Sequence, residues 1–278
     1  MSSQPPAPDD PLLPSYSLDF LSPSVQERIT STTPFRFHQP FPSSPSFVEP
    51  FIPIPSAPGQ LELILSPARP SDLSAHVECL LDPRVSTLLT GPAGRDAFVD
   101  FSQSLKPQWD YNQRYFDALA TSEGRDEMEW LIPVSVIRVK ETGAWVGLFS
   151  IYRWNYREIT GEKEQKKQKK RNWQLEIGDS RLVWGLGYCL HPRFQGIGIM
   201  TRVLSSVFKC VLMDYLEAKV VRTTTYTDNL ASIRVQEKCG MKKKEGSEFS
   251  PPAKEEWSTR GFPGRREIVL EWRKEWAF

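Results

Sequence analysis

The stretch GYCLHPRFQGIGIMTRVL (187–204) decides the fold, because a strand-like run ends in a glycine loop and an amphipathic helix follows directly. Gly196 and Gly198 let backbone N–H groups approach a ligand without interference from a Cβ atom, and the N-terminus of a helix attracts anions. One helix and one strand later comes TTTYTDNLASIRVQEKCGM (223–241). Together the two stretches predict a site for a pyrophosphate-bearing cofactor.

The composition favours one folded domain behind a proline-rich tail. The chain has 278 residues, of which 39% are hydrophobic and 12% aromatic, enough for one sizeable core. Fourteen of the 24 prolines precede residue 60, and proline at this density does not support long helices or strand ladders. We expect residues 1–58 to be a Pro/Ser-rich tail, flexible or packed on the surface, and residues 59–278 to form the domain.

Charge and cysteine content exclude several classes of protein. A net charge of +1 gives no overall attraction to nucleic acid or to acidic membranes. The cysteines have no CxxC spacing, so neither a zinc site nor a disulfide framework is indicated, and a reducing compartment fits best. The start MSSQPPAPDD does not resemble a signal peptide, and no uncharged apolar run approaches the roughly 18 residues of a membrane span. We expect a cytoplasmic protein, with the nucleus as an alternative.

Hydrophobic periodicity predicts an α/β (α+β) order of elements around a central sheet. Pro107 leaves open whether residues 95–120 form one helix or two. The expected strands are 61–68, the two arms of a hairpin within 130–154, 182–190, 219–226 and 265–272, and the other expected helices are 70–81, 197–218 and 229–238.

A basic insert interrupts this order at residues 156–177. It has no apolar period, and we expect a long loop. Contact with nucleic acid or the ribosome is one interpretation, and a solvated loop is the other; the second is favoured because surface charge runs are common. The basic residues are Lys163, Lys166, Lys167, Lys169, Lys170 and Arg171.

The glycine loop is neither a Walker loop, which needs Gly-Lys-Ser/Thr, nor a dinucleotide fingerprint, whose third glycine position is Thr201 here. With LELILSPARPSD, ETGAWVGLFSI and TDNLASIRVQEKCGMKKKEG, the stretch GLGYCLHPRFQGIGIMTRVL resembles the GNAT N-acetyltransferase superfamily, in particular its RimJ/RimL-like branch, over about residues 60–278. The resemblance implies a GNAT-type mixed, mostly antiparallel central sheet flanked by helices. It also implies that two strands splay apart at an acetyl-CoA site.

The resemblance further implies which residues hold acetyl-CoA. Backbone groups of Cys189, Leu190 and His191 pair with the pantetheine arm, and Asn229, which opens the next helix, contacts the same arm. A backbone N–H near Leu190 or Cys189 is the expected oxyanion donor. The loop that holds the pyrophosphate, with N–H donors and polar side chains, comprises Arg193, Gln195, Gly196, Ile197, Gly198 and Ile199.

Direct transfer to an amine needs no covalent enzyme intermediate, but it needs a donor for the leaving sulfur. Many GNAT enzymes use a tyrosine on the helix after the asparagine, and NLASIRVQEK has none. Ser232, three residues after Asn229, is the candidate catalytic donor. Alternatively, its hydroxyl satisfies the first turn of the helix.

The general base is harder to assign, because VWGLGYCL carries no acid where GNAT enzymes often place a Glu. Glu176 is the catalytic candidate, with Asp179 and Glu158 as alternatives. His191 is expected to end its strand and pack against the loop instead. Since an α-amine has a pKa near 7.7–8.0 and lysine one near 10.4, the missing acid favours an acceptor amine of low pKa.

A cysteine nucleophile is disfavoured, because Cys189, Cys210 and Cys239 alternate with apolar neighbours and are better explained by core packing. We therefore predict an acetyl-CoA-dependent N-acetyltransferase without a metal, whose acceptor is the primary amine of a protein N-terminus or a small molecule. The alternative is a weakly active or inactive acyl-CoA-binding module that acts through protein or RNA contacts of the tail and the basic insert.

Overall fold

The computed structural model describes residues 18, 21–40, 47–89, 97–121, 132–250 and 265–276. The chain divides into two compact units. The first consists of residues 1–82, 94–149 and 189–194, and the second of residues 83–93, 150–188 and 195–278. Strands β5 (Trp145–Arg153) and β6 (Val183–Leu190) each contribute residues to both units.

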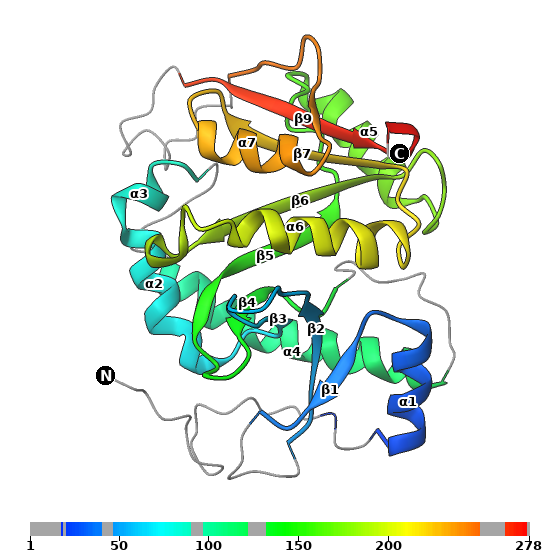
Figure 1. The fold of residues 1–278 in the computed structure, drawn as a ribbon. Helices are drawn as coiled ribbons and strands as arrows, with labels where there is room; N and C mark the ends of the chain where they lie inside the picture. Colours follow the sequence, from blue (N-terminus) through cyan, green and yellow to red (C-terminus); the bar gives the residue numbers. More distant parts are fainter. Residues whose placement is uncertain are drawn as a thin grey trace. The chain divides into compact units, whose positions relative to one another are not determined.

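The first unit is an antiparallel sheet with helices (Figure 1). Its strands pair in the order β1, β2, β3, β4 and the first part of β5, and the β4–β5 hairpin confirms the hairpin predicted within 130–154. The further strands and helical segments of this unit are β1 (Arg36–His38), β2 (Glu49–Ile54), β3 (Leu63–Ser66), β4 (Val136–Val139), α1 (Pro23–Thr32), η1 (Pro70–Asp72), α2 (Leu73–Leu81), α4 (Ala97–Thr121) and η2 (Pro192–Phe194).

Residues assigned to the tail are part of this unit's core. Strand β2 pairs with β3, and Phe35 is fully buried edge-on against Tyr115 and Phe116 of α4, with ring centroids 5.7 and 5.3 Å apart. The expected flexible or surface-packed tail is therefore wrong for α1, Phe35 and strands β1 and β2. Proline is tolerated there because β2 carries two prolines in a short strand and α1 begins with one at its first position. Residues 1–17, 19–20 and 41–46 of the predicted tail lie outside the described residues.

Helix α4 settles the question left open by Pro107, because one helix runs through it. The first unit also buries charge. Arg69 donates to both carboxylate oxygens of Glu49, at 2.9 and 2.7 Å, and Arg138 donates to both oxygens of Asp72, at 2.7 and 2.9 Å. These bidentate pairs join β2, β4 and the start of α2.

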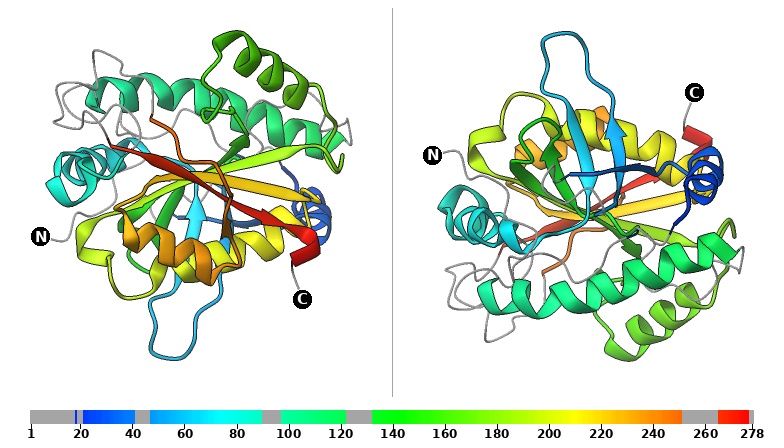
Figure 2. Two further views of the ribbon diagram at one scale, coloured as in Figure 1. Left: turned by 90° about the horizontal axis from the view of Figure 1, so that it is seen from above. Right: turned by 90° about the horizontal axis from the view of Figure 1, so that it is seen from below.

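The second unit is a smaller mixed sheet covered on both faces. Figure 2 shows α6 and α7 along one face of its strands and α5 on the other. Strand β6 is parallel to β7, whereas β9 is antiparallel to both β7 and β8. The mixed, mostly antiparallel sheet flanked by helices confirms the predicted fold class. The unit's other elements are α3 (Pro83–Ser86), α5 (Glu162–Trp173), α6 (Ile199–Val207), the π-helical η3 (Phe208–Met213), β7 (Val220–Tyr226), α7 (Leu230–Lys238), β8 (Lys242–Lys243), β9 (Glu267–Arg273) and η4 (Lys274–Trp276).

The basic insert is helical where a loop was expected. Helix α5 forms because Glu, Lys and Gln favour helices, and because acids in the first turn and bases in the last suit the helix dipole. Buried Asn172 anchors it, since its side chain accepts from the N–H and donates to the C=O of Val183, both at 2.9 Å. The predicted loop is wrong for residues 162–173, because polar side chains hold this helix by hydrogen bonds in place of an apolar face.

Among the described residues there is neither a membrane-spanning helix nor a cluster of metal-ligating side chains. No helix among them has the length and apolar character needed to cross a membrane. Nor do the described residues contain a group of three or more His, Cys, Asp or Glu side chains able to hold a metal ion.

Candidate active site

Strands β6 and β7 begin as a parallel pair and then part. Their register consists of Val183↔Val220, Trp184↔Val221 and Gly185↔Arg222, although β6 continues to Leu190 and β7 to Tyr226. Within the second unit, residues 186–188 and 223–226 therefore form the two arms of a splay beyond the last pair. A ligand that presents backbone-like polar groups fits between such edges, because strand edges carry N–H and C=O groups that need partners.

The predicted cofactor loop follows β6 and adopts the conformation that glycine allows. Gly196 and Gly198 have φ values of 78° and 81°, and Gly198 is the N-cap of α6. No atom lies within 4 Å of the Cβ position at either glycine. Exposed residues 195–198 thus lead into the first turn of α6 at Ile199, as predicted, and they form an open loop at a helix N-terminus.

Residues 189–194 belong to the first unit. His191 is buried, its N–H donates to the Val146 carbonyl at 2.9 Å, and its Nδ1 accepts from the N–H of exposed Arg193 at 3.2 Å. His191 thus follows the last residue of β6 and packs as expected. Its N–H thus already has a partner, and the predicted pairing of the backbone groups of Cys189, Leu190 and His191 with pantetheine stays a prediction.

Ser232 takes part in a hydroxyl cluster and does not cap its helix. The cap is Asn229, whose Oδ1 accepts from the Ser232 N–H at 3.1 Å. The Ser232 hydroxyl instead lies 2.9 Å from the Tyr188 hydroxyl and accepts from Gln236 Nε2 at 2.9 Å. The first-turn alternative for the Ser232 hydroxyl is therefore wrong.

Tyr188 is the residue that the sequence analysis missed. It lies at the splayed end of β6, and its hydroxyl accepts from Gln236 Nε2 at 3.0 Å. Burial raises the pKa of Tyr188, so the phenol stays protonated at neutral pH. Alternation along the quoted GYCL motif was an available signal, because Trp184, Leu186 and Tyr188 share one face of β6.

The hydroxyl cluster, defined as Tyr188, Ser232 and Gln236, has one hydroxyl hydrogen more than its internal hydrogen bonds use. The Gln236 side-chain amide donates one N–H to each hydroxyl oxygen. One hydroxyl hydrogen lies between Tyr188 and Ser232, whichever of the two donates. The second hydroxyl hydrogen is available to another acceptor. When it is on Tyr188, it also lies near the Ser232 carbonyl, at a long 3.4 Å. The cluster can therefore donate a hydrogen bond to a ligand.

Glu176 is exposed and lies seven residues before the first residue of β6. The predicted catalytic roles of Glu176 and Ser232 stay predictions. Asp179 pairs with Arg181 at 2.7 Å, and Glu158 accepts from Trp154 Nε1 at 3.0 Å, so both alternatives already have structural partners.

The cysteines behave as packing residues, as expected. Cys189 is buried, and its thiol interacts with that of buried Cys79. Burial raises the pKa of both Cys210 and Cys239, which disfavours the thiolate that a nucleophile requires.

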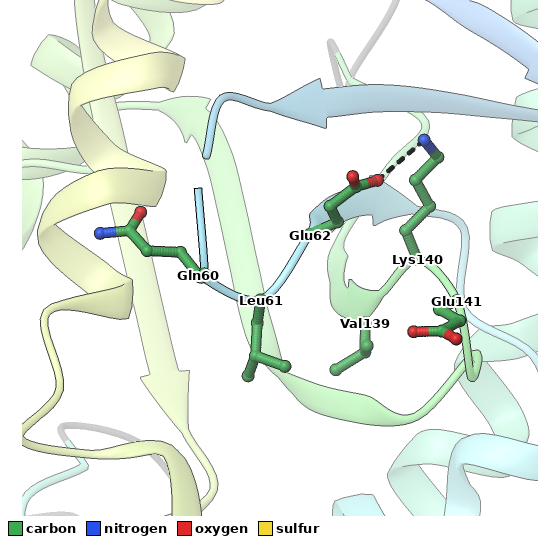
Figure 3. A pocket seen from close by; sticks show the side chains of 7 residues that line it. Gln60, Leu61, Glu62, Val139, Lys140 and Glu141 are labelled. Carbon is green, nitrogen blue, oxygen red and sulfur yellow. Dashed lines mark hydrogen bonds and ion pairs between the residues drawn. The ribbon is translucent and has the colours of Figure 1, made fainter. Parts of the chain in front are cut away.

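A hollow of about 650 Å³ in the first unit is lined by residues 59–62 and 139–141 (Figure 3). Glu62 and Lys140 form an ion pair there at 3.0 Å, and both side chains are more than half exposed. None of the predicted site residues lines the hollow. An exposed pair of this kind contributes about 0–1 kcal/mol to stability.

Comparison with known proteins agrees with this geometry. Residues 62–242 match the acetyltransferase (GNAT) domain model. The chain is similar to the ribosomal-protein-S5-alanine acetyltransferase of Vibrio fischeri, with 14% identity, 82% of this chain and 100% of that chain covered, and a TM-score of 0.51. It is also similar to a GNAT-family acetyltransferase of Bacillus anthracis, with 14% identity, 81% and 99% covered, and a TM-score of 0.50. At these identities the likeness shows the fold. No curated protein sequence matches the chain significantly.

Proposed function

The chain belongs to the GNAT family of acetyltransferases, whose cosubstrate is acetyl-CoA, and we propose that it transfers acetyl directly to the primary amine of a protein N-terminus or a small molecule. The observation that carries the proposal is the splay of β6 and β7, which opens where Tyr188 and Ser232 meet. Placement in the RimJ/RimL-like branch is part of the proposal, supported by the motifs of the sequence.

The residues present fit acetyl-CoA. The open loop at Gly196 and Gly198 offers N–H groups at the start of α6 to a pyrophosphate, and a Cβ atom there would force strain at positive φ. The splayed strand edges suit the amide-rich pantetheine. Bound acetyl-CoA supplies an activated acetyl thioester.

The hydroxyl cluster serves the leaving sulfur. Gln236 holds both hydroxyl oxygens, so the remaining hydroxyl hydrogen of Tyr188 or Ser232 donates to the sulfur as negative charge develops on it. Because burial keeps the Tyr188 phenol protonated, the donor is present throughout the neutral range. This arrangement replaces the helix tyrosine of other GNAT enzymes with a strand tyrosine and a helix serine.

An acceptor of low pKa suits this site, because β6 carries no acid. The α-amine of a peptide loses its proton more readily than a lysine side chain. The similar Vibrio fischeri protein is a ribosomal-protein-S5-alanine acetyltransferase, which supports an N-terminal amine as the first acceptor to test.

The test is calorimetric titration of the chain with acetyl-CoA, CoA and ATP, followed by an acetyl-transfer assay on peptides with free α-amines, peptides with lysine only, and small amines. We expect both CoA species to bind and ATP not to bind. Gly196→Trp should abolish binding, whereas Ser232→Ala and Tyr188→Phe should bind CoA normally and transfer about tenfold more slowly. Tight CoA binding without transfer to any amine would favour the acyl-CoA-binding module.

A further inference from the structure

At the splay, the face of the sheet opposite the hydroxyl cluster carries a buried acid, Glu267. In the register of β7 and β9, Tyr226 lies opposite Glu267 and Thr224 lies opposite Val269, so the four side chains share one face. Ser232 and Tyr188 lie on the other face, because Tyr188 has the parity of Trp184, which pairs with Val221. Glu267 is thus at the splayed end of β7, with the sheet between it and the hydroxyl cluster.

Glu267 is fully buried and only partly satisfied. Its Oε1 accepts from Arg157 at 3.0 Å, and the Thr224 hydroxyl also interacts with the carboxylate. Its Oε2 is buried and has no hydrogen-bond partner among the described residues. A buried carboxylate oxygen without a donor is costly, and such groups need an explanation beyond packing.

The same face of β6 has no side chain of its own at two positions, and side chains of β5 cover it there. Gly185 and Gly187 present no side chain there, and the Tyr152 ring lies against Gly185 so closely that a Cβ atom would overlap it. Near Gly187 the Ser150 hydroxyl lies 3.1 Å from the Cβ position. The face therefore combines glycine backbone, hydroxyls and an aromatic ring around the arm of the splay.

We propose that this face is the acceptor site, and that Glu267 Oε2 takes the proton of a substrate ammonium which enters the splay opposite Ser232. The inference rests on the proposed function, and it assigns the group that accepts a proton from the amine in that reaction. The substrate class is a protonated primary amine, since the site offers one buried carboxylate oxygen beside neutral hydroxyls. The neighbouring acids Glu158 and Glu271 are both paired with Arg222.

The proton balance is simple. The ammonium gives one proton to Glu267 and becomes a neutral amine. Its nitrogen forms the new C–N bond to the acetyl carbon as the thioester C–S bond breaks, and the sulfur receives a proton through the hydroxyl cluster. The nitrogen loses its second proton to solvent, and the Glu267 carboxyl returns its own to solvent, so one acetyl group is transferred and one net proton is released.

The surroundings of Glu267 suit a base that works near neutral pH. Burial raises its pKa, and Arg157 lowers it in part. The charged or titratable groups that face it are Arg157 from the segment after β5, Tyr152 from β5 itself, and Tyr226 from β7, whose ring carries the Arg265 guanidinium at 4.6 Å. Burial raises the pKa of Tyr152 to about 12, so this neighbour stays neutral.

The test compares Glu267→Gln with Glu271→Gln in the full chain. Glu271 is a matched control, because it lies on the same face of β9 and accepts from Arg222 at 2.7 Å, but beside the paired end of β6 and β7. Transfer to an alanine-starting peptide is measured from about pH 5 to about pH 9, with acetyl-CoA hydrolysis as a second readout that needs no peptide. We expect Glu267→Gln to lower kcat/KM by about 100-fold or more and to flatten its rise with pH, with CoA affinity within about twofold of wild type.

Glu267→Asp, which keeps the carboxylate, should recover part of the rate and the pH-dependent rise. The proposal is overturned if Glu267→Gln keeps the wild-type pH profile and a rate within about threefold, or if Glu271→Gln loses as much. If Glu267→Gln does not fold, the aspartate variant decides: a pH profile identical to wild type counts against the proposal, and a shifted profile supports it. Failure of the wild-type chain to bind CoA would instead overturn the proposed function.

Discussion

Two buried glutamates, one in each unit, have opposite electrostatic environments. Glu49 receives two guanidinium hydrogen bonds from Arg69. Although burial raises its pKa, Arg69, His38 and Arg138 together bring that pKa down to about 2. Glu267 receives one such bond from Arg157 and interacts with the Thr224 hydroxyl, and its Oε2 has no hydrogen-bond partner within the part of the chain that the structure describes. Its pKa is raised because burial prevails.

The difference separates structural carboxylates from reactive ones. A carboxylate whose lone pairs are filled by guanidinium donors stays ionised and joins elements, as Glu49 does between β2 and Arg69. A carboxylate buried with too few donors keeps a tendency to accept a proton, which is the property of a base. Both lie in strands with ion-pair partners, so burial alone does not distinguish them.

The largest expected effect is on stability at Glu49. Glu49→Gln keeps the shape but leaves Arg69 without its counter-charge, and the difference between a pKa of 4.5 and about 2 corresponds to roughly 3 kcal/mol. Because the folded pKa is lowered, this stability is present above about pH 4.5 and is lost as pH falls towards 2. Denaturant unfolding at several pH values should show the acid-dependent loss in wild type and not in the variant. Glu62→Gln, at the exposed pair with Lys140, should change stability by less than about 0.5 kcal/mol.

A second variant sharpens the comparison at Arg157. Arg157→Met removes the one guanidinium bond of Glu267, so the pKa of Glu267 should rise further. The rise of kcat/KM with pH should then move upward by about one pH unit, equivalent to about 1.4 kcal/mol. Arg181→Met, at the exposed pair with Asp179, is the control and should leave the profile unchanged. An unmoved profile in Arg157→Met would mean that another group sets the pH dependence.

The smallest expected effect is on stability at Glu267, where the dependence on pH has the opposite sign to that at Glu49. Since the pKa of Glu267 is raised in the folded state, wild-type stability falls as pH rises from the ordinary glutamate range through that raised pKa. Glu267→Gln carries no charge, so above neutral pH it should be as stable as wild type or more stable by about 1 kcal/mol. A loss of more than about 1 kcal/mol at pH 8 would show that Glu267 is as structural as Glu49.

Local chemistry explains which predictions succeeded. The glycine loop was predictable because only residues tolerant of positive φ fit a tight strand-to-helix turn, and Asn229 because an N-cap is a one-turn interaction. The hairpin of β4 and β5 follows from β-rich runs around a short glycine turn. Helix α5 was missed because its residues favour a helix without an apolar period, and because one of its anchors, Asn172, bonds a strand residue eleven positions away.

The sequence by itself determined the family, the β4–β5 hairpin, the alternation of strands and helices after residue 182 and the glycine loop, since local patterns of residues specify them. Only the tertiary structure decided which side chains meet. Tyr188 and Ser232 are 44 positions apart, and Arg157 and Glu267 are 110 apart. These pairs form because strand order and register bring distant residues onto one face, and no local pattern of residues specifies that pairing.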